Sequence, residues 1–281
     1  MSLCARCWGA ATIVCGFASG CGAAFGIDLH KDARLTLEGS EIVSETAGHP
    51  EMSSHLVECC VEVVFKKFGY EGGVRVKTES NIPFGAGLKS SSVTCNAVVL
   101  GLVHALGVQD ELSDDQIINL GVDAAYNAGV TATGALDDAS AAYYGGLAFT
   151  DNLKREIQFR ALVEDNKIVI LLPEGSRDSG AIDRRKLSTL KETINDLWRI
   201  GPKDPWHILT LNGLLHCRLF KQDPSPVFAA LEAGALGCGL SGTGPSVVAV
   251  CDEEADVESS FKQFEGEIIT CNTNNRRAEI L

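Results

Sequence analysis

The segment at residues 81–92 carries the residue types from which a phosphate-binding loop is built. It contains Gly85 and Gly87 and ends in three serines, where an apolar helix is expected to start. Glycines allow backbone N–H groups to approach a ligand closely, and the start of a helix favours negative charge. Because a triphosphate needs both, the segment predicts a nucleotide site, although a glycine–serine turn before a buried helix has the same composition.

The two commonest nucleotide-binding fingerprints do not describe this loop. A P-loop requires a glycine followed directly by a lysine, and the sequence holds no Gly-Lys dipeptide. A dinucleotide fold requires Gly-x-Gly-x-x-Gly, and the run from Gly20 to Gly26 misses that spacing by one residue. A nucleotide site in this chain must therefore use a different loop.

The composition excludes several classes of partner. The 281 residues carry a formal net charge of −13, which repels nucleic acids and acidic membrane surfaces. The eleven cysteines are scattered and lack zinc-ligand spacing, so we expect free thiols in a cytoplasmic protein. Glycines and Arg6 interrupt the apolar N-terminal stretch, which argues against a signal peptide, and no apolar segment is long enough for a membrane span. The expected partners are small molecules, and both monomer and homodimer stay open.

Periodicity and turn residues predict the elements that must position the loop. Strands are expected at residues 11–14, 74–78, 167–173, 246–251 and 267–272, and a hairpin at 33–37 and 41–46. Helices are expected at 53–68, 91–106, 187–200, 205–221, 225–233 and 254–264. A capping box of Ser113 and Gln116 starts another helix that ends near Ala128. A Gly-rich turn should extend through Gly26, and a change of composition predicts two domains, 1–155 and 156–281.

Two more glycine-rich segments carry groups suited to phosphoryl transfer. Residues 239–246 read Gly-Leu-Ser-Gly-Thr-Gly-Pro-Ser and are expected to form a turn between a helix and a strand. Residues 133–140 contain Asp137 and Asp138, followed by Gly145 and Gly146. Carboxylates at a helix start also complement the helix dipole, which is the alternative to a catalytic role.

Together the three segments resemble the GHMP kinase superfamily, named for galactokinase, homoserine kinase, mevalonate kinase and phosphomevalonate kinase. Its motif Pro-x-x-x-Gly-Leu-x-Ser-Ser-[Ser/Ala] matches residues 83–92. The resemblance implies an α+β fold of two domains, the first like ribosomal protein S5 domain 2 and the second ferredoxin-like, with the site between them. It also implies ATP and Mg²⁺ as cofactors.

Within the superfamily, the chain is similar to the archaeal-type shikimate kinases. The similarity rests on residues 9–14, 19–29, 87–92, 131–140 and the tail 270–275. It implies ATP-dependent phosphorylation of the shikimate 3-hydroxyl, giving shikimate 3-phosphate and ADP in aromatic amino-acid biosynthesis. Two alternatives stay open: a GHMP kinase for another small alcohol such as homoserine or mevalonate, and a non-catalytic sensor of nucleotide and metabolite.

The resemblance also implies roles for single residues. Counting back from Gly146 places Asp138 on the family's catalytic aspartate, and Ser91 is the implied Mg²⁺ ligand. The nucleotide phosphates are expected at Pro83, Phe84, Gly85, Ala86, Gly87, Leu88, Lys89, Ser90, Ser91 and Ser92. The substrate is expected at Thr12, Ser19, Thr133, Asp137, Gly242, Thr243 and Gly244.

The chain departs from the wider family in two places. Many members carry a lysine or histidine near the first strand, whereas residues 12–26 hold no charge. Many also carry a metal-binding glutamate upstream of the catalytic aspartate, where this chain has Asn127, with Asp123 as an alternative ligand. A substrate carboxylate favours a cation in its pocket, and the candidates are Lys31, Lys89, Arg177, Arg184 and Arg185.

Overall fold

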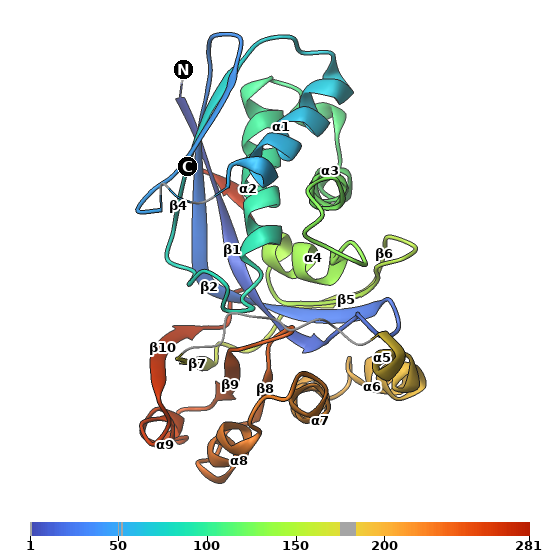
Figure 1. Ribbon diagram of the computed structural model, residues 1–281, viewed down its shortest axis with the longest axis vertical. Helices are drawn as coiled ribbons and strands as arrows, with labels where there is room; N and C mark the ends of the chain where they lie inside the picture. The colour runs from blue at the N-terminus through green and yellow to red at the C-terminus, as the bar shows by residue number, and fades with distance from the viewer. Residues whose placement is uncertain (1, 50, 52, 175–183) are drawn as a thin grey trace.

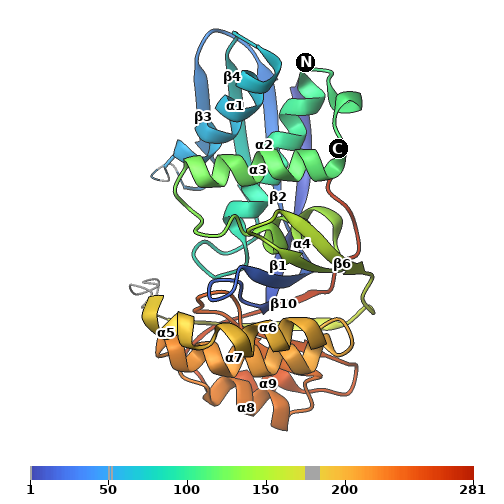
Figure 2. The ribbon, with the colours of Figure 1, turned by 90° about the vertical axis from the view of Figure 1, so that its right-hand side faces the viewer.

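The computed structural model describes residues 2–49, 51, 53–174 and 184–281. Within these residues, seven strands form one sheet and four form another. The two sheets belong to an N-terminal and a C-terminal domain that stack end to end, each with its own layer of helices (Figures 1 and 2). This is the two-domain α+β architecture expected from the sequence.

The first sheet is built around two long antiparallel strands. Its order is β11-β1-β2-β4-β3, and β5 and β6 extend it from β2. β1 and β2 continue down to the second domain, so their lower ends lie between the two helical layers (Figure 1). The strands are β1 (Ser2–Val14), β2 (Cys21–Leu37), β3 (Ile42–Thr46), β4 (Val74–Ser80), β5 (Leu147–Asp151), β6 (Glu156–Ala161) and β11 (Glu279–Ile280).

Four helices cover one face of this sheet (Figure 1). They are α1 (His55–Phe68), α2 (Ser90–Ala105), α3 (Asp114–Asn127) and α4 (Leu136–Tyr144), with a short 3-10 helix η1 (Gln109–Glu111) before α3. Every residue of α2 from Val93 to Val103 is buried, which confirms the burial predicted for this helix. The predicted capping box of α3 is also present, because the Ser113 hydroxyl accepts from Gln116 N while Ser113 N donates to the Gln116 side chain.

The second domain has ferredoxin-like topology. Its antiparallel sheet has the order β10-β7-β9-β8, and its helices form one layer beneath it (Figure 2). The strands are β7 (Lys167–Pro173), β8 (Gly237–Leu240), β9 (Val247–Cys251) and β10 (Gly266–Asn272). The helices are α5 (Arg184–Thr189), α6 (Lys191–Ile200), α7 (Pro205–Phe220), α8 (Ser225–Glu232) and α9 (Val257–Phe261).

After β10 the chain returns to the first domain, where it forms hydrogen bonds with β2 and with the turn before β5. Asn274 N donates to Gly26 O at 2.9 Å, and Gly146 N donates to Asn274 O at 2.7 Å. A Cβ on Gly26 would lie 2.7 Å from Asn274 O, so only glycine allows this approach. The polar tail at 270–275 therefore stabilises the region where β2 and the Gly145–Gly146 turn meet.

One strand predicted near the N-terminus is too short, and two other predictions there are wrong. The short strand at 11–14 is part of the thirteen-residue β1, and the Gly-rich turn through Gly26 ends earlier because β2 starts at Cys21. The predicted hairpin is absent from the described residues: β3 pairs in parallel with β4, and β4 lies beside β2. The small, weakly strand-forming residues of β1 and β2 pair because both strands are buried in the sheet, which overrides local preference.

Two helix predictions need smaller corrections. The single helix expected at 187–200 is two helices, α5 and α6, which separate at Leu190. The helix expected at 254–264 forms only over Val257–Phe261. In addition, the residue pattern predicts neither the extent of α4 nor the strand β8, because both elements are short and rich in glycine or alanine.

Candidate active site

The predicted segments meet in one cleft of about 1160 Å³, open solvent included. The loop before α2 and the first turn of α2 contribute residues 84–92, and the turn before β9 contributes Gly242 and Thr243. The third side comes from Asp137 and Asp138 at the start of α4, together with residues near the ends of β1 and β5. The residues that line this side, near the ends of β1 and β5 and in the loop before α4, include Thr12, Cys15, Gly16, Thr133, Ala135 and Asn152.

The loop at 81–89 has a backbone that glycine makes possible. Gly85 and Gly87 adopt positive φ angles of 69° and 74°. A Cβ on Gly87 would lie 2.5 Å from Ser241 O, and the Gly87 carbonyl accepts a 2.8 Å hydrogen bond from Ser241 Oγ. The loop is thus held against the turn of the second domain, which explains why glycine is required at position 87.

Thr12 joins the same turn to the end of β1. Its hydroxyl accepts from Gly242 N at 2.9 Å, and its own N–H donates to Ser241 Oγ at 3.2 Å. Because Thr12 is 1% exposed, its hydroxyl already serves the backbone of the turn. Its geometry therefore supports a role in holding the cleft together.

Helix α4 places two adjacent carboxylates at the cleft. It begins after Ala135, which has a left-handed conformation with φ 48°. The Asn96 side chain of α2 donates to Ala139 O at 2.8 Å, which ties the first turn of α4 to the central helix. At the other end, the Tyr143 and Tyr144 hydroxyls donate to carboxylates of α3. Both ends of α4 are thus fixed, and the positions of Asp137 and Asp138 follow.

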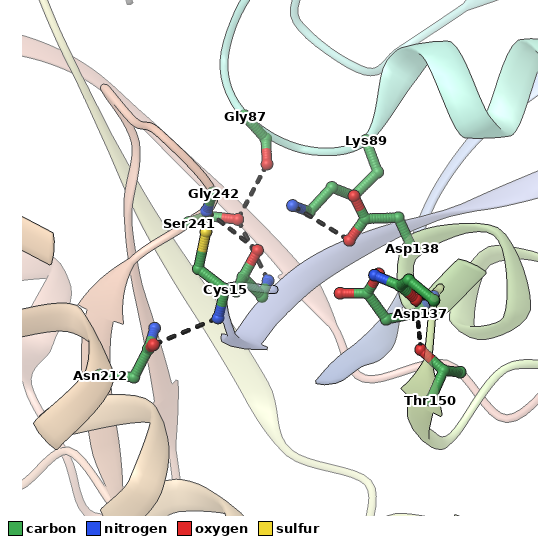
Figure 3. A network of polar contacts seen from close by, with 11 residues as sticks. Cys15, Gly87, Lys89, Asp137, Asp138, Thr150, Asn212, Ser241 and Gly242 are labelled. Atoms are coloured by element: carbon green, nitrogen blue, oxygen red, sulfur yellow. Dashed lines mark hydrogen bonds and ion pairs between the residues drawn. The ribbon is translucent and has the colours of Figure 1, made fainter. Parts of the chain in front are cut away.

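Asp137 is held by the end of β5. Asn152 Nδ2 donates to Asp137 Oδ1 at 2.8 Å, and Asp137 N donates to Asn152 Oδ1 at 3.2 Å. The Thr150 hydroxyl donates to the same Asn152 oxygen at 2.6 Å, which orients the amide (Figure 3). The carboxylate packs on Gly22 of β2 so closely that a Cβ there would collide with it. Gly22 is therefore a glycine because Asp137 needs the space.

Asp138 has a different partner. Lys89 Nζ lies 3.1 Å from Asp138 Oδ1, and the two side chains are only 10% and 15% exposed. In Figure 3 the Lys89 side chain extends from the end of the loop at 81–89 toward Asp138, beside Gly242. Lys89 occupies the N-cap of α2 with φ 65°, a strained conformation for a residue with a side chain. That conformation directs the ammonium group across the cleft.

The two aspartates differ in the charged groups that act on their pKa values. Burial raises the pKa of Asp137 to about 7, and the neighbouring charge of Asp138 acts in the same direction. Burial also raises the pKa of Asp138, but the adjacent Lys89 opposes this shift. Burial alone would lower the pKa of Lys89, yet Asp138 and Asp137 together raise it above its ordinary value. The ammonium therefore stays charged and favours the ionised form of Asp138.

Several residues singled out in the sequence lie elsewhere. Pro83, Ser19 and Gly244 do not line the cleft, and the Ser19 hydroxyl is bonded to the backbone of Cys21. Asp123 is 44% exposed and pairs with Arg155 at 2.6 Å outside the cleft; Asn127 is exposed and does not line it either. Arg177 falls outside the described residues, as do the side chains of Arg184 and Arg185.

Two features of the site cannot be predicted from the sequence. The pairing of Lys89 with Asp138 supplies the cation that residues 12–26 lack, but nothing in the local sequence links these two positions. The sequence does not predict the contact of Asn152 with Asp137 either, because a single asparagine after a strand is usually a turn residue. Its position behind Asp137 depends on how β5 and α4 pack.

The donor set of the cleft suits a hard cation held by few protein ligands. Ser91 is exposed at the start of α2 and lines the cleft with the two aspartates. In the part of the chain that the structure describes, no group of three or more His, Cys, Asp or Glu residues could hold a metal ion. Mg²⁺ commonly binds through one or two protein oxygens, substrate phosphates and waters, so the residues present fit it.

Among the described helices, none is both long and apolar enough to span a bilayer.

The amino-acid sequence is similar to two family models and to several known proteins. A family model described as "GHMP kinases N terminal domain" matches residues 55–146, and one described as "GHMP kinases C terminal" matches 227–265. A shikimate kinase of Methanothermobacter thermautotrophicus is 38% identical over 280 residues, covering 97% of this chain and 96% of that protein. A shikimate kinase of Halobacterium salinarum is 42% identical over 260 residues, covering 91% and 90%.

The fold also matches solved structures. A homoserine kinase from Cytophaga hutchinsonii superposes with a TM-score of 0.76 over 100% of this chain and 97% of that one, at 18% identity. At that identity the likeness concerns the fold alone. The substrate must be argued from the full-length relatives and from the cleft.

Proposed function

The chain belongs to the GHMP kinases and, within them, to the archaeal shikimate kinases; on that premise we propose that it transfers the γ-phosphoryl group of ATP to the 3-hydroxyl of shikimate. The products are shikimate 3-phosphate and ADP. The observation that carries the proposal is the meeting of the phosphate loop, the Lys89–Asp138 pair and the 239–246 turn in one cleft. The free cysteines of the described chain fit a cytoplasmic site of action.

Backbone groups of the loop at 84–91 bind the ATP phosphates. The positive φ angles of Gly85 and Gly87 turn the chain around the site, and α2 directs its N-terminal N–H groups toward it. The helix terminus contributes about 0.3–1 kcal/mol toward binding a negative charge. Because that is small for a triphosphate, Lys89 adds a full positive charge at the same end of the helix.

Asp138 accepts the proton of the attacking hydroxyl. As the acceptor oxygen bonds to the γ-phosphorus, the bond from phosphorus to the ADP oxygen breaks and the hydroxyl proton passes to Asp138. Lys89 keeps Asp138 ionised before the transfer and lies close enough to the loop to bind the moving phosphoryl oxygens. Ser91 would hold Mg²⁺, which would neutralise phosphate charge when bound.

Asp137 binds and orients hydroxyl groups of the acceptor. Asn152 occupies one carboxylate oxygen, which leaves the other to interact with a ligand in the cleft. With a pKa near neutrality, Asp137 is able to donate or accept such a hydrogen bond. Thr133 and Thr243 line the same cleft and supply further polar contacts.

A panel of acceptor alcohols tests the function. The purified protein is given ATP, Mg²⁺ and either shikimate, homoserine or mevalonate, and ADP release is followed. The proposal expects release with shikimate and not with the other two. Release with homoserine or mevalonate instead would assign a different GHMP kinase activity, and nucleotide binding without release for any acceptor would assign a sensor.

A further inference from the structure

Lys31 is a buried cation beneath the phosphate loop. It projects from β2 and is only 6% exposed. Its ammonium donates to Thr94 Oγ1 at 2.7 Å and to Ser90 Oγ at 3.2 Å, so it joins the sheet to the first turn of α2. Lys31 does not line the cleft, but Ser90, which it contacts, does.

Such a lysine is costly in the ligand-free protein. Burial lowers the pKa of Lys31 to about 8, and only the Cys95 thiol acts in the opposite direction. No carboxylate in the described part of the chain offsets the charge, whereas buried charges are usually paired. The positive end of α2 points the same way, which adds to the cost. An anion bound at this end of the helix would relieve both effects.

The hydrogen positions around Lys31 follow from its chemistry. An ammonium group only donates, so the Ser90 and Thr94 hydroxyl oxygens must both accept from it. Thr94 then donates its own hydrogen to Ser90 O at 2.8 Å. Ser90 has its hydrogen left to donate, and its side chain lies at the cleft. The network therefore fixes the Ser90 hydroxyl as a donor toward a ligand.

We propose that Lys31 is a positioning residue of the nucleotide phosphate subsite, which orients the Ser90 hydroxyl toward a phosphate oxygen and places a positive charge directly behind it. This inference rests on the nucleotide half of the proposed function. Lys31 acts through Ser90 and does not touch the nucleotide. It takes no part in recognising the acceptor alcohol.

The test measures ADP binding by titration calorimetry, without Mg²⁺ or acceptor. The variants are Lys31→Met, Ser90→Ala and the double variant, with Lys77→Met as the matched control. Lys77 also projects from a strand of the first sheet but is half exposed and pairs with Glu45. Lys31→Met should weaken ADP binding about 10- to 100-fold, as expected for loss of a charged hydrogen-bond donor. Lys77→Met should bind ADP like the wild type.

Two further readouts separate positioning from mere structural support. Because Lys31 acts through Ser90, Lys31→Met should weaken ADP binding less in the Ser90→Ala background than in the wild type. The ligand-free Lys31→Met protein should melt at or above the wild-type temperature, while its KM for shikimate stays within about twofold of the wild-type value.

The inference is overturned if folded Lys31→Met binds ADP with wild-type affinity, or if its effect and that of Ser90→Ala are simply additive. Should Lys31→Met fail to fold, Ser90→Ala alone decides, because it must weaken ADP binding for the inference to hold. A wild-type protein that binds ADP but does not phosphorylate shikimate would refute the proposed reaction. The ADP-binding test of Lys31 would still be valid. A wild-type protein that does not bind ADP would refute both.

Discussion

Lys89 and Asp138 lie 3.1 Å apart although they come from the N-terminal ends of two different helices, α2 and α4. In the proposed reaction, Lys89 therefore supplies the cation for the carboxylate that faces the acceptor. Thr12 and Cys15, near the end of β1, line the cleft together with this pair. On that proposal, the binding of the nucleotide and the ionisation of Asp138 would both depend on Lys89.

Replacing Lys89 should separate its charge from its backbone conformation. Lys89→Met removes the ammonium, and Lys89→Gly removes it while favouring the left-handed backbone at this position. If the charge is what matters, both variants lose about 10²–10³-fold in kcat. Steady-state kinetics measures this, and near-normal kcat in Lys89→Gly would show that the residue only shapes the loop.

Gly87 should be far less replaceable than another glycine with the same backbone angle. Gly87→Ala brings a Cβ against Ser241 O, whereas Gly107 has φ 72° with nothing within 4 Å of an added Cβ. Both alanines cost about 1–2 kcal/mol of stability from the left-handed conformation. Only Gly87→Ala should also raise the KM for ATP, at least about tenfold. Equal kinetic effects in the two variants would contradict the contact between the loop and the turn.

Ser91→Ala tests the proposed metal ligand. We expect the Mg²⁺ concentration needed for half-maximal activity to rise about tenfold, because a hydroxyl ligand is replaced by water. Activity is measured over a Mg²⁺ series at saturating ATP and shikimate. Binding of metal-free ADP serves as the control and should stay unchanged, and an unaltered Mg²⁺ dependence would remove Ser91 from the metal site.

Lys31 predicts an alkaline rise in stability. Its folded-state pKa of about 8 lies below the ordinary value of 10.5. Between these values the unfolded chain binds more protons than the folded one, so the free energy of unfolding rises with pH across this window. Chemical denaturation of wild type and Lys31→Met from pH 7 to 10.5 should show the wild type gaining stability relative to the variant. A constant difference would mean that Lys31 keeps an ordinary pKa.

The sequence predicted well those features that depend on neighbouring residues. The capping box of Ser113 and Gln116, the burial of α2 and the strand Lys167–Pro173 all follow from local pattern and spacing. The loop before α2 lines the cleft, as its glycines and serines at a helix start lead one to expect of a ligand-binding segment. The two-domain fold came from the resemblance and not from periodicity.

The sequence could not predict features that depend on packing between distant segments. The strand β1 contains many small residues, and it forms because β2 and the tail cover it. Asn152 reaches Asp137, and Ser241 reaches Gly87, only after separate elements have packed. From its charge alone, Lys31 is a candidate partner for a substrate carboxylate, but its contact with Ser90 appears only in three dimensions.

The central claim is that Asp138, paired with Lys89, activates the 3-hydroxyl of shikimate for attack on ATP. Its most direct test is NMR identification of the product formed from ATP, Mg²⁺ and shikimate by the wild type, Asp138→Asn and Asp137→Asn. The account predicts a phosphate on the 3-oxygen with the wild type, and the same product with a raised KM for shikimate in Asp137→Asn. Asp138→Asn should turn over about 10²–10⁴-fold more slowly while binding ADP normally. Phosphate on another oxygen, or near wild-type turnover by Asp138→Asn, would contradict it.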